Sequence, residues 1–406
     1  MKSMHIPLFG TLRTQTLACS GIIGLFIVFS ASLSQAASAP KEINPSAKPL
    51  VFGMSTALSG PAQYLGHSMR NGVLAAFERT QLKKHRIQNR SLKLHVKDDS
   101  YQPDSALSNV KQLIQSEQVL ALIGNVGTPT AAKTAPYANS QQVPFFAAYT
   151  GAAILRQDPP QPYVINLRAG YEREAEVIIR YILNQGIKPT EIAFLLQGEN
   201  EFEADDYGKA GYGAARKALK TQGFTETKAK RLFKTYYPRN TLSINSALKN
   251  FLRQPASPRA IIIVGAYAPS AKFINYAQSL FTKTLFFNLS FTGASALAKE
   301  LQPHSDRVFI TQVVPQISPS LKISQDFEQD MKKFLPGKPI NAISFEGYLA
   351  GRALIDALHT IDGDINRDSI RIALNRLKQD QLKQDIHEVW LAKYDPRLGF
   401  TPVYSN

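Results

Sequence analysis

Cysteine is nearly absent from this sequence of 406 residues, which contains Cys19 and no other. Cys19 precedes most of the apolar run from Ala18 to Ala31, whereas a lipid-modified cysteine would follow such a run. We therefore expect neither disulfide bonds nor a lipid anchor. Without disulfides the fold depends on its hydrophobic core, which a chain of this length with 44% hydrophobic residues is able to build.

Long apolar runs are also missing. A membrane-spanning helix needs about 20 apolar residues, and the run near the N-terminus is shorter and interrupted by serines. Lys2 and Arg13 precede this run, and Ser34-Gln35-Ala36 follows it with the small-x-small pattern of a signal-peptidase site. We predict that residues 1–36 are a cleavable signal peptide and that the rest of the chain is exported.

Patterns typical of catalysis and of metal binding are absent as well. The histidines show no HxH or HxxxH spacing, so metal binding has no specific support. The stretch IGNVGTPT at residues 123–130 lacks the lysine of a phosphate-binding loop and does not match GxGxxG. No GxSxG elbow is present, and no cysteine nucleophile follows the signal peptide. We expect no metal and no cofactor, and an enzyme is not favoured.

Acidic residues are fewer than basic ones, 31 against 47, which gives a formal net charge of +16. Lys2 and Arg13 are the charged residues of the signal peptide, so its removal lowers this charge to +14. The basic residues are scattered and form no stripe interleaved with aromatic residues. This distribution favours a solvated basic surface over a nucleic-acid or membrane interface.

Short apolar runs alternate with segments of helical period, as in parallel sheets with crossover helices. In the first half of the chain the predicted strands are 50–54, 92–97, 119–123 and 143–147, and the predicted helices are 68–82, 104–115 and 130–139. The pattern resumes after Ala169 with strands 191–196, 230–234 and 260–264 and helices 172–184, 208–222, 243–252 and 270–280. Two such blocks predict an α/β fold of two doubly wound parallel-sheet lobes, joined at residues 163–168.

Loops that follow predicted strands are the expected place for function. Open parallel sheets bind ligands beyond the carboxyl ends of their strands, where the backbone N–H groups at helix starts are free. Residues 55–64, 123–130 and 148–152 bring small residues and hydroxyl groups to such helix starts. These loops suit an anionic or polar group held by N–H and O–H donors, for capture rather than for chemistry.

Five motifs in one order carry a resemblance: GMSTALSGPAQYLGHSMRNGVLAAFE, KDDSYQPDSALSNVKQLI, IGNVGTPTAAKTAP, DDYGKAGYGAARKAL and FEGYLAGRALIDAL. Each motif alone is modest, but five in register over some 300 residues are specific. With them the sequence resembles the periplasmic substrate-binding proteins of the leucine/isoleucine/valine-binding family, whose type I binding fold serves ABC importers. The resemblance spans nearly all of the chain after the signal peptide.

The resemblance implies two α/β lobes joined by three hinge crossings, which close on a small molecule. By analogy the crossings lie near Ala169, near residues 315–318 and near Gly399. Arg168 and Ala169 are the expected hinge residues. In this division lobe 1 comprises residues 47–168 and 318–398, and lobe 2 comprises residues 169–317 and 399–406.

The resemblance also implies the ligand contacts. Thr128, Ala148 and Thr150 match the loops whose hydroxyl and backbone groups hold the ligand carboxylate in the amino-acid binders of the family. The threonines equally suit helix N-caps, and the tyrosines of the expected site equally suit an exposed surface. Four further side chains complete the expected site at the cleft mouth and in lobe 2: Gln63, Tyr64, Tyr207 and Tyr267.

One position departs from the pattern of the family. Its amino-acid binders carry an acidic residue, which pairs with the ligand ammonium, after the strand that matches residues 285–288. Here the following segment, residues 289–293, reads LSFTG and has no carboxylate. A buried ammonium without a counter-charge is costly. A carboxylate or other polar ligand with an apolar body, contacted by Ser290 and Phe291, therefore fits at least as well as an α-amino acid.

We therefore expect a monomeric periplasmic protein that captures a small polar organic ligand, amino-acid-like or carboxylate, by hinge closure and presents it to ABC permease subunits. The alternative is a receptor that senses its ligand and reports to a membrane signalling protein, which the neighbouring genes would reveal. Two further classes stay open. A cleft enzyme would turn its ligand over, and a binder of acidic polymers would show steep salt dependence.

Overall fold

The computed structural model describes residues 48–203, 205–383 and 388–405, so the predicted signal peptide lies outside the described residues. The first of two sheets is parallel throughout and has the strand order β2-β1-β3-β4-β5. Its strands are β1 (Leu50–Thr56), β2 (Leu92–Asp98), β3 (Leu122–Ile123), β4 (Phe145–Phe146) and β5 (Val164–Ile165).

The second sheet has the order β12-β11-β10-β9-β8-β6-β7. The strands from β10 to β7 in this order are parallel, whereas β11 is antiparallel to both β10 and β12. Its strands are β6 (Ile192–Gln197), β7 (Lys234–Tyr237), β8 (Ala260–Val264), β9 (Leu285–Asn288), β10 (Val308–Gln312), β11 (Trp390–Asp395) and β12 (Gly399–Ser405).

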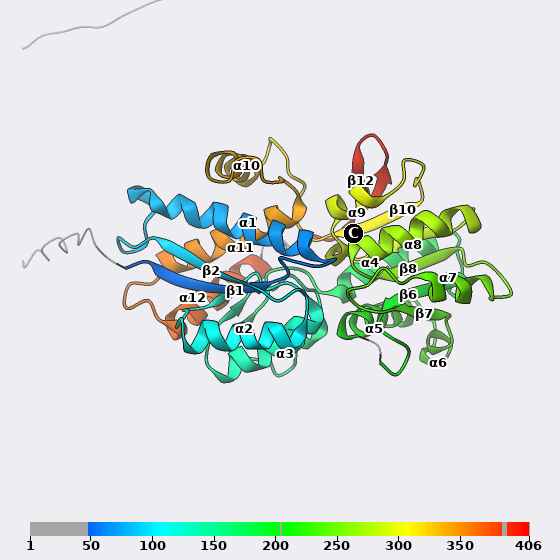
Figure 1. The fold of residues 1–406 in the computed structure, drawn as a ribbon, viewed down its shortest axis with the longest axis horizontal. Coiled ribbons are helices and arrows are strands. Elements are labelled where there is room, and N and C mark those ends of the chain that lie inside the picture. Colours follow the sequence, from blue (N-terminus) through cyan, green and yellow to red (C-terminus); the bar gives the residue numbers. More distant parts are fainter. Residues whose placement is uncertain (1–47, 204, 384–387, 406) are drawn as a thin grey trace, which may run out of the picture. The chain divides into compact units, whose positions relative to one another are not determined.

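Helices cover both faces of the first sheet (Figure 1). On one face Phe52 of β1 packs against Phe77 of α1, with ring centroids 5.5 Å apart. On the other face Leu122 of β3 joins an apolar cluster with Leu113 of α2 and Ala135 of α3. We call this sheet and its helices lobe 1. The helices are α1 (Gln63–Glu78), α2 (Pro103–Gln115), α3 (Thr128–Ser140), α10 (Lys322–Phe334), α11 (Ala342–His359) and α12 (Arg367–Lys383).

Helices α1 and α11 approach closely because glycines stand at their contact. A Cβ atom added at Gly72 would lie 1.9 Å from the carbonyl oxygen of Ser344, and one added at Gly347 would lie 2.3 Å from that of Met69. Asn341 caps α11, since its side-chain oxygen accepts hydrogen bonds from the N–H groups of Ile343 and Ser344. This pair of helices packs on one face of the first sheet.

The second sheet and its helices are called lobe 2 below. Helices α4 and α5 pack against each other and contact the strands. The helices of this lobe are α4 (Tyr171–Asn184), α5 (Asp206–Thr221), α6 (Glu226–Lys230), α7 (Asn245–Leu252), α8 (Tyr267–Leu280) and α9 (Ala294–Glu300). Short 3-10 turns complete the described chain: η1 (Arg79–Gln81), η2 (Lys83–His85), η3 (Ala153–Leu155), η4 (Pro189–Glu191) and η5 (Ser290–Thr292).

These lobes confirm the predicted α/β class with two lobes built on parallel strands. The strand predicted at residues 230–234 is wrong, because residues 226–230 form α6 and β7 begins at Lys234. The side chain of Thr225 accepts a hydrogen bond from the N–H of Lys228 and thereby caps this short helix. Within the described residues, no helix combines the length and the apolar composition needed to cross a membrane.

The predicted boundary of lobe 1 at residue 398 is also wrong, as is the third crossing near Gly399. Strand β11 belongs to the second sheet, so the chain returns to lobe 2 between α12 and β11. A turn, not a crossing, follows β11. In it Asp395 accepts hydrogen bonds from the N–H groups of Arg397 and Leu398, and Gly399 adopts a φ of +74°.

Candidate functional site

Three hydroxyl groups meet where strands of lobe 1 end. Thr128 is the first residue of α3, Thr150 lies in the loop after β4, and Tyr171 is the first residue of α4. The Oγ1 atoms of Thr128 and Thr150 lie 2.7 Å apart, and the hydroxyl of Tyr171 lies 3.3 and 3.2 Å from them. All three side chains are buried. Each hydroxyl donates and accepts, so this hydroxyl cluster can adapt to a polar group of either kind.

The start of α3 beside this cluster presents open backbone donors. No side chain caps this helix, and its N-cap residue Gly127 has a φ of +115°. A Cβ atom at Gly127 would lie 2.5 Å from the ring of Tyr101, so only glycine fits this corner. The glycine-rich stretch IGNVGTPT thus brings a helix N-terminus with unpaired N–H groups to the hydroxyl cluster, which favours a polar or anionic group.

Aromatic rings from both lobes meet at the same place. Phe291 of lobe 2 is fully buried, and its ring centroid lies 6.0 Å from that of Tyr101, 5.5 Å from that of Tyr149 and 4.6 Å from that of Tyr207. The ring of Tyr207 lies 5.6 Å from that of Tyr171. The buried hydroxyl of Tyr207 has no hydrogen-bond partner among the described residues. Such an orphan group indicates a position that a ligand or water satisfies.

Tyr64, which the resemblance places at the cleft mouth, and Tyr267, which it places in lobe 2, face each other across the lobes. The rings of Tyr64 and Tyr267 have centroids 6.1 Å apart and meet edge to face. The hydroxyl of Tyr64 accepts a hydrogen bond from Asn341, and the ammonium of Lys299 lies 4.7 Å from its ring centroid. Gln63 is exposed on the first turn of α1. Tyr64 and Tyr267 thus contact each other across the lobes, and Gln63 lies outside their contact.

Arg168 lies between the lobes with its side chain 2% exposed. Its guanidinium carbon lies 4.5 Å from the ring centroid of Tyr149. Its Nε lies 3.6 Å from a carboxylate oxygen of Glu346 on α11, and its Nη2 lies 3.9 Å from Glu174 on α4 and donates to the hydroxyl of Ser290. Burial disfavours its charge, but Glu346, Tyr149 and Glu174 together raise the pKa of Arg168 above its ordinary value. Burial also disfavours the charge of Glu346 and therefore raises its pKa, although Arg168 opposes this shift.

Glu174 places a carboxylate beside the segment that lacks one of its own. One of its oxygens accepts from the N–H of Ser290 at 2.7 Å and from the hydroxyl of Thr311, and the other accepts from the hydroxyl of Ser290 at 2.9 Å. With Arg168 nearby, this carboxylate is occupied by protein donors. In the sequence Glu174 is an acidic residue in the first turn of a helix, which is common, so no spacing signals its role.

Ala148 and Ala169 are buried beside these groups. The carbonyl oxygen of Ala148 accepts the N–H of Thr150 at 2.8 Å, which shapes the loop that holds the hydroxyl cluster. Arg156, which sequence reasoning missed, donates to the carbonyl oxygen of Arg168 at 2.8 Å and to that of Ala169 at 3.4 Å. Burial lowers the pKa of Arg156 to about 10. Arg156 therefore braces the first crossing through the backbone.

The structure thus brings together Thr128, Ala148 and Thr150 and separately joins Ser290 to Arg168. Phe291 and Tyr207 lie in a ring cluster together with Tyr101, Tyr149 and Tyr171. Tyr64 and Tyr267 form a separate contact across the lobes. Sequence reasoning missed four members: Tyr171, Glu174 and Glu346, which are buried, and Arg156, which is half-buried. Within the part of the chain that the structure describes, no three His, Cys, Asp or Glu side chains form a group able to hold a metal ion.

Comparisons with known proteins agree with this geometry. The family model described as periplasmic binding protein matches residues 49–388. A possible leucine/isoleucine/valine-binding protein from Rhodopirellula baltica SH 1 is similar in structure, with 34% identity and a TM-score of 0.80 over 90% of this chain and 98% of that one. No curated protein matches.

More distant structures share the fold. A solute-binding protein of an ABC transporter from R. palustris, in complex with benzoate, has 17% identity and a TM-score of 0.70 over 88% of this chain and 96% of that one. A branched-chain amino acid transporter substrate-binding protein from Streptococcus pneumoniae, in complex with isoleucine, has 14% identity and a TM-score of 0.66 over 88% and 100%. From the family match and the two-lobed fold it follows that this chain belongs to the periplasmic binding proteins, a family of substrate-binding proteins rather than enzymes.

Proposed function

We propose that the protein captures a small polar organic ligand, amino-acid-like or carboxylate, between its lobes and delivers it to the permease subunits of an ABC importer. The hydroxyl cluster of Thr128, Thr150 and Tyr171 carries this proposal. It supplies adaptable donors beside an uncapped helix start, and Tyr207 and Phe291 face it from lobe 2. A ligand that contacts both sides selects the closed state, because only that state offers both sets of contacts.

The ligands in the names of similar proteins support a carboxylate. Isoleucine, benzoate and fatty acid occur there, and each of these compounds carries a carboxyl group. A carboxylate needs donors, which the hydroxyl cluster and the start of α3 provide. An ammonium needs free acceptors, and Glu174 is already occupied by Ser290 and Thr311. This occupation favours a carboxylate without an ammonium over an α-amino acid.

Export completes the proposal. We infer that residues 1–36 are removed by a signal peptidase and that the protein acts in the periplasm as a monomer. The basic N-terminal residues, the apolar run and Ser34-Gln35-Ala36 support this cleavage. The N-terminal sequence of the protein recovered from a periplasmic extract tests it, and a start at Ala37 is the expected result.

A thermal-shift screen of residues 37–406, freed of bound ligand by unfolding and refolding, tests the ligand class. The screen compares α-amino acids with carboxylates, amides and purines that lack an ammonium. A ligand at about 100 times its Kd stabilises the folded state by about 2.7 kcal/mol, enough for a shift of several degrees. We expect carboxylates without an ammonium to raise the Tm most. A response confined to α-amino acids would reverse that order and require another acceptor for the ammonium.

Matched variants test the site itself. Thr128→Val and Thr150→Val each remove one hydroxyl at nearly constant volume, and each should weaken the best ligand about tenfold or more, because a ligand group loses a buried partner. Thr134→Val is the control, since Thr134 is buried on α3 but bonds only the helix carbonyl of Thr130. Unchanged affinity in both Thr128→Val and Thr150→Val would show that the ligand binds elsewhere.

A further inference from the structure

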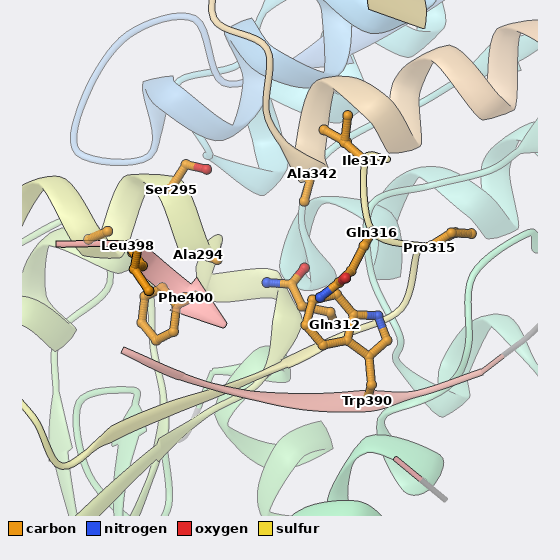
Figure 2. A pocket seen from close by; sticks show the side chains of 12 residues that line it. Ala294, Ser295, Gln312, Pro315, Gln316, Ile317, Ala342, Trp390, Leu398 and Phe400 are labelled. Carbon is orange, nitrogen blue, oxygen red and sulfur yellow. The ribbon is translucent and has the colours of Figure 1, made fainter. Parts of the chain in front are cut away.

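A cavity of about 480 Å³ lies beside the second crossing between the lobes (Figure 2). Helix α9 and the adjoining ends of β10, β11 and β12 form its lobe 2 side. The crossing segment 315–317 and Ala342, the first residue of α11, form the rest. The residues of the hydroxyl cluster do not line it, and its volume falls within the range of small-molecule sites.

A buried amide without a partner points into this hinge cavity. Gln312, the last residue of β10, is 6% exposed, and its side-chain amide makes no hydrogen bond to any described residue. Figure 2 shows this amide in the midst of the lining side chains, with Gln316 and Trp390 close by. An amide needs both acceptors and donors as partners. The amide of Gln312 faces the cavity, so a ligand or water there is able to supply both.

The rest of the wall is mostly apolar, and Ser295 and Gln316 are its other polar side chains. The indole N–H of Trp390 donates to the carbonyl oxygen of Val314 at 2.9 Å, which sets the orientation of its ring. Phe400 and Leu398 of the β11–β12 hairpin lie across from the crossing segment (Figure 2).

Charge is absent from this lining. All of the lining side chains are uncharged, whereas a neighbouring cavity of about 250 Å³ is lined by Arg168, Glu346, Arg352 and Asp356. A charged ligand group would lose its hydration in the hinge cavity without gaining a counter-charge. The occupant is therefore neutral, unlike the carboxylate proposed for the cleft between the lobes.

We propose that the hinge cavity is a second ligand-binding site, for an uncharged molecule with a flat apolar body and a carboxamide-like group. The apolar body packs against Trp390, and the amide pairs with Gln312 through one donated and one accepted hydrogen bond. Because the walls come from both lobes and from the crossing segment, an occupant also stabilises the arrangement of the lobes seen here. This inference is independent of the ligand proposed for the cleft.

Trp390 is the only tryptophan of the chain and lines the cavity, so its fluorescence reports on the surroundings of this site. The experiment titrates the purified protein, residues 37–406, with benzamide at millimolar concentrations and follows the emission of Trp390. Benzoate has the same shape with a charge, and toluene lacks the amide. We expect a saturable change with benzamide and binding about tenfold weaker or more with benzoate and toluene.

Three variants decide the outcome. Gln312→Leu removes the amide at similar volume and Ala298→Leu narrows the cavity, and each should weaken benzamide about tenfold. Thr150→Val should leave the Trp390 response unchanged, because Thr150 belongs to the hydroxyl cluster. The absence of a saturable change would overturn the proposal. So would an affinity for benzamide in both cavity variants equal to that of the parent protein, or a response that Thr150→Val abolishes. If no compound raises the Tm in the thermal-shift screen for the cleft, the result of the benzamide titration still stands.

Discussion

Asp99 is a buried carboxylate that follows β2 and lies close to the ring cluster. Its oxygens accept the hydroxyl of Ser55 at 2.7 Å and the N–H of Tyr101 at 2.9 Å. Burial raises its pKa to about 7, since the two hydrogen bonds offset the burial only in part and Asp98 adds to the shift. Because Tyr101 packs on Phe291 of lobe 2, the charge of this single residue acts on a loop that helps to close the molecule.

The raised pKa of Asp99 makes the stability depend on pH. The folded protein holds this proton up to about pH 7, whereas the unfolded chain releases it near pH 4. The free energy of unfolding therefore falls as the pH rises from about 4 to about 7 and has lost this contribution above that range. In Asp99→Asn we expect the free energy of unfolding to differ less between pH 5 and pH 8 than in the parent protein, by at least about 1 kcal/mol. Urea unfolding at both pH values measures it.

The control for this prediction is Asp362→Asn, since Asp362 is exposed. It should leave the difference between the two pH values as in the parent protein. If Asp99→Asn behaves like this control, Asp99 does not titrate in the range that its burial indicates.

Single residues of the site were predictable only where a local pattern marked them. Thr128 and Thr150 follow strands and start loops, so the sequence brings them to one sheet edge, and the structure joins them at 2.7 Å. Glu174 lies in an ordinary first helical turn, and Glu346 lies in the motif FEGYLAGRALIDAL, which does not mark it as a partner of Arg168. Only the packing of α4 and α11 around Arg168 turns them into partners. Contacts of this kind have no local signal, because residues far apart in the chain create them.

At the scale of elements, α1 and α11 depend on glycine for their separation. In Gly72→Ala the new Cβ atom would meet the backbone of Ser344 and Tyr348, which cannot rotate away as a side chain can. We expect the substitution to lower the free energy of unfolding by about 1–3 kcal/mol, as overpacking does. Chemical denaturation followed by circular dichroism measures the loss.

Gly213→Ala is the matched control for this element. Gly213 lies in the interior of α5, is exposed, and would place its Cβ atom in open space. Alanine should stabilise the helix there by up to about 1 kcal/mol. Equal effects of the two substitutions would mean that the close contact of α1 with α11 does not limit the residue at position 72.

Element types were more predictable than their partners. The strand at residues 260–264 is predicted to the residue, because an unbroken apolar run between turn signals is typical of a buried parallel strand. The assignment of β11 to lobe 1 failed because its partner β10 is distant in sequence and an antiparallel neighbour has no crossover helix to announce it. The turn at Asp395 and Gly399 was the overlooked signal.

At the scale of the whole molecule, Arg168 joins the lobes from within. It lies at the first crossing and contacts Glu346 of lobe 1 together with Glu174 and Ser290 of lobe 2. Arg168→Met would leave two buried carboxylates without their cation. Losing one partner of a buried charge cluster costs about 3–5 kcal/mol, and we expect a loss of about 3 kcal/mol in urea unfolding.

A double variant separates charge from packing in this cluster. Arg168→Met combined with Glu346→Gln removes one of the stranded carboxylates, so it should recover part of the stability that Arg168→Met alone loses. A loss below about 1 kcal/mol in the single variant, or no recovery in the double variant, would contradict a bridging role for the ion cluster.

The burial of Phe291 has a consequence for how tightly any ligand can bind. The rings of Tyr101, Tyr149 and Tyr207 surround this side chain. If the ligand binds between the hydroxyl cluster and Tyr207, it has to displace the side chain of Phe291. This side chain is part of the protein, so dilution does not remove it. The free energy of binding is then the difference between the state with the ligand in that space and the state with Phe291 in it. Release of the ligand is assisted each time Phe291 returns to that space.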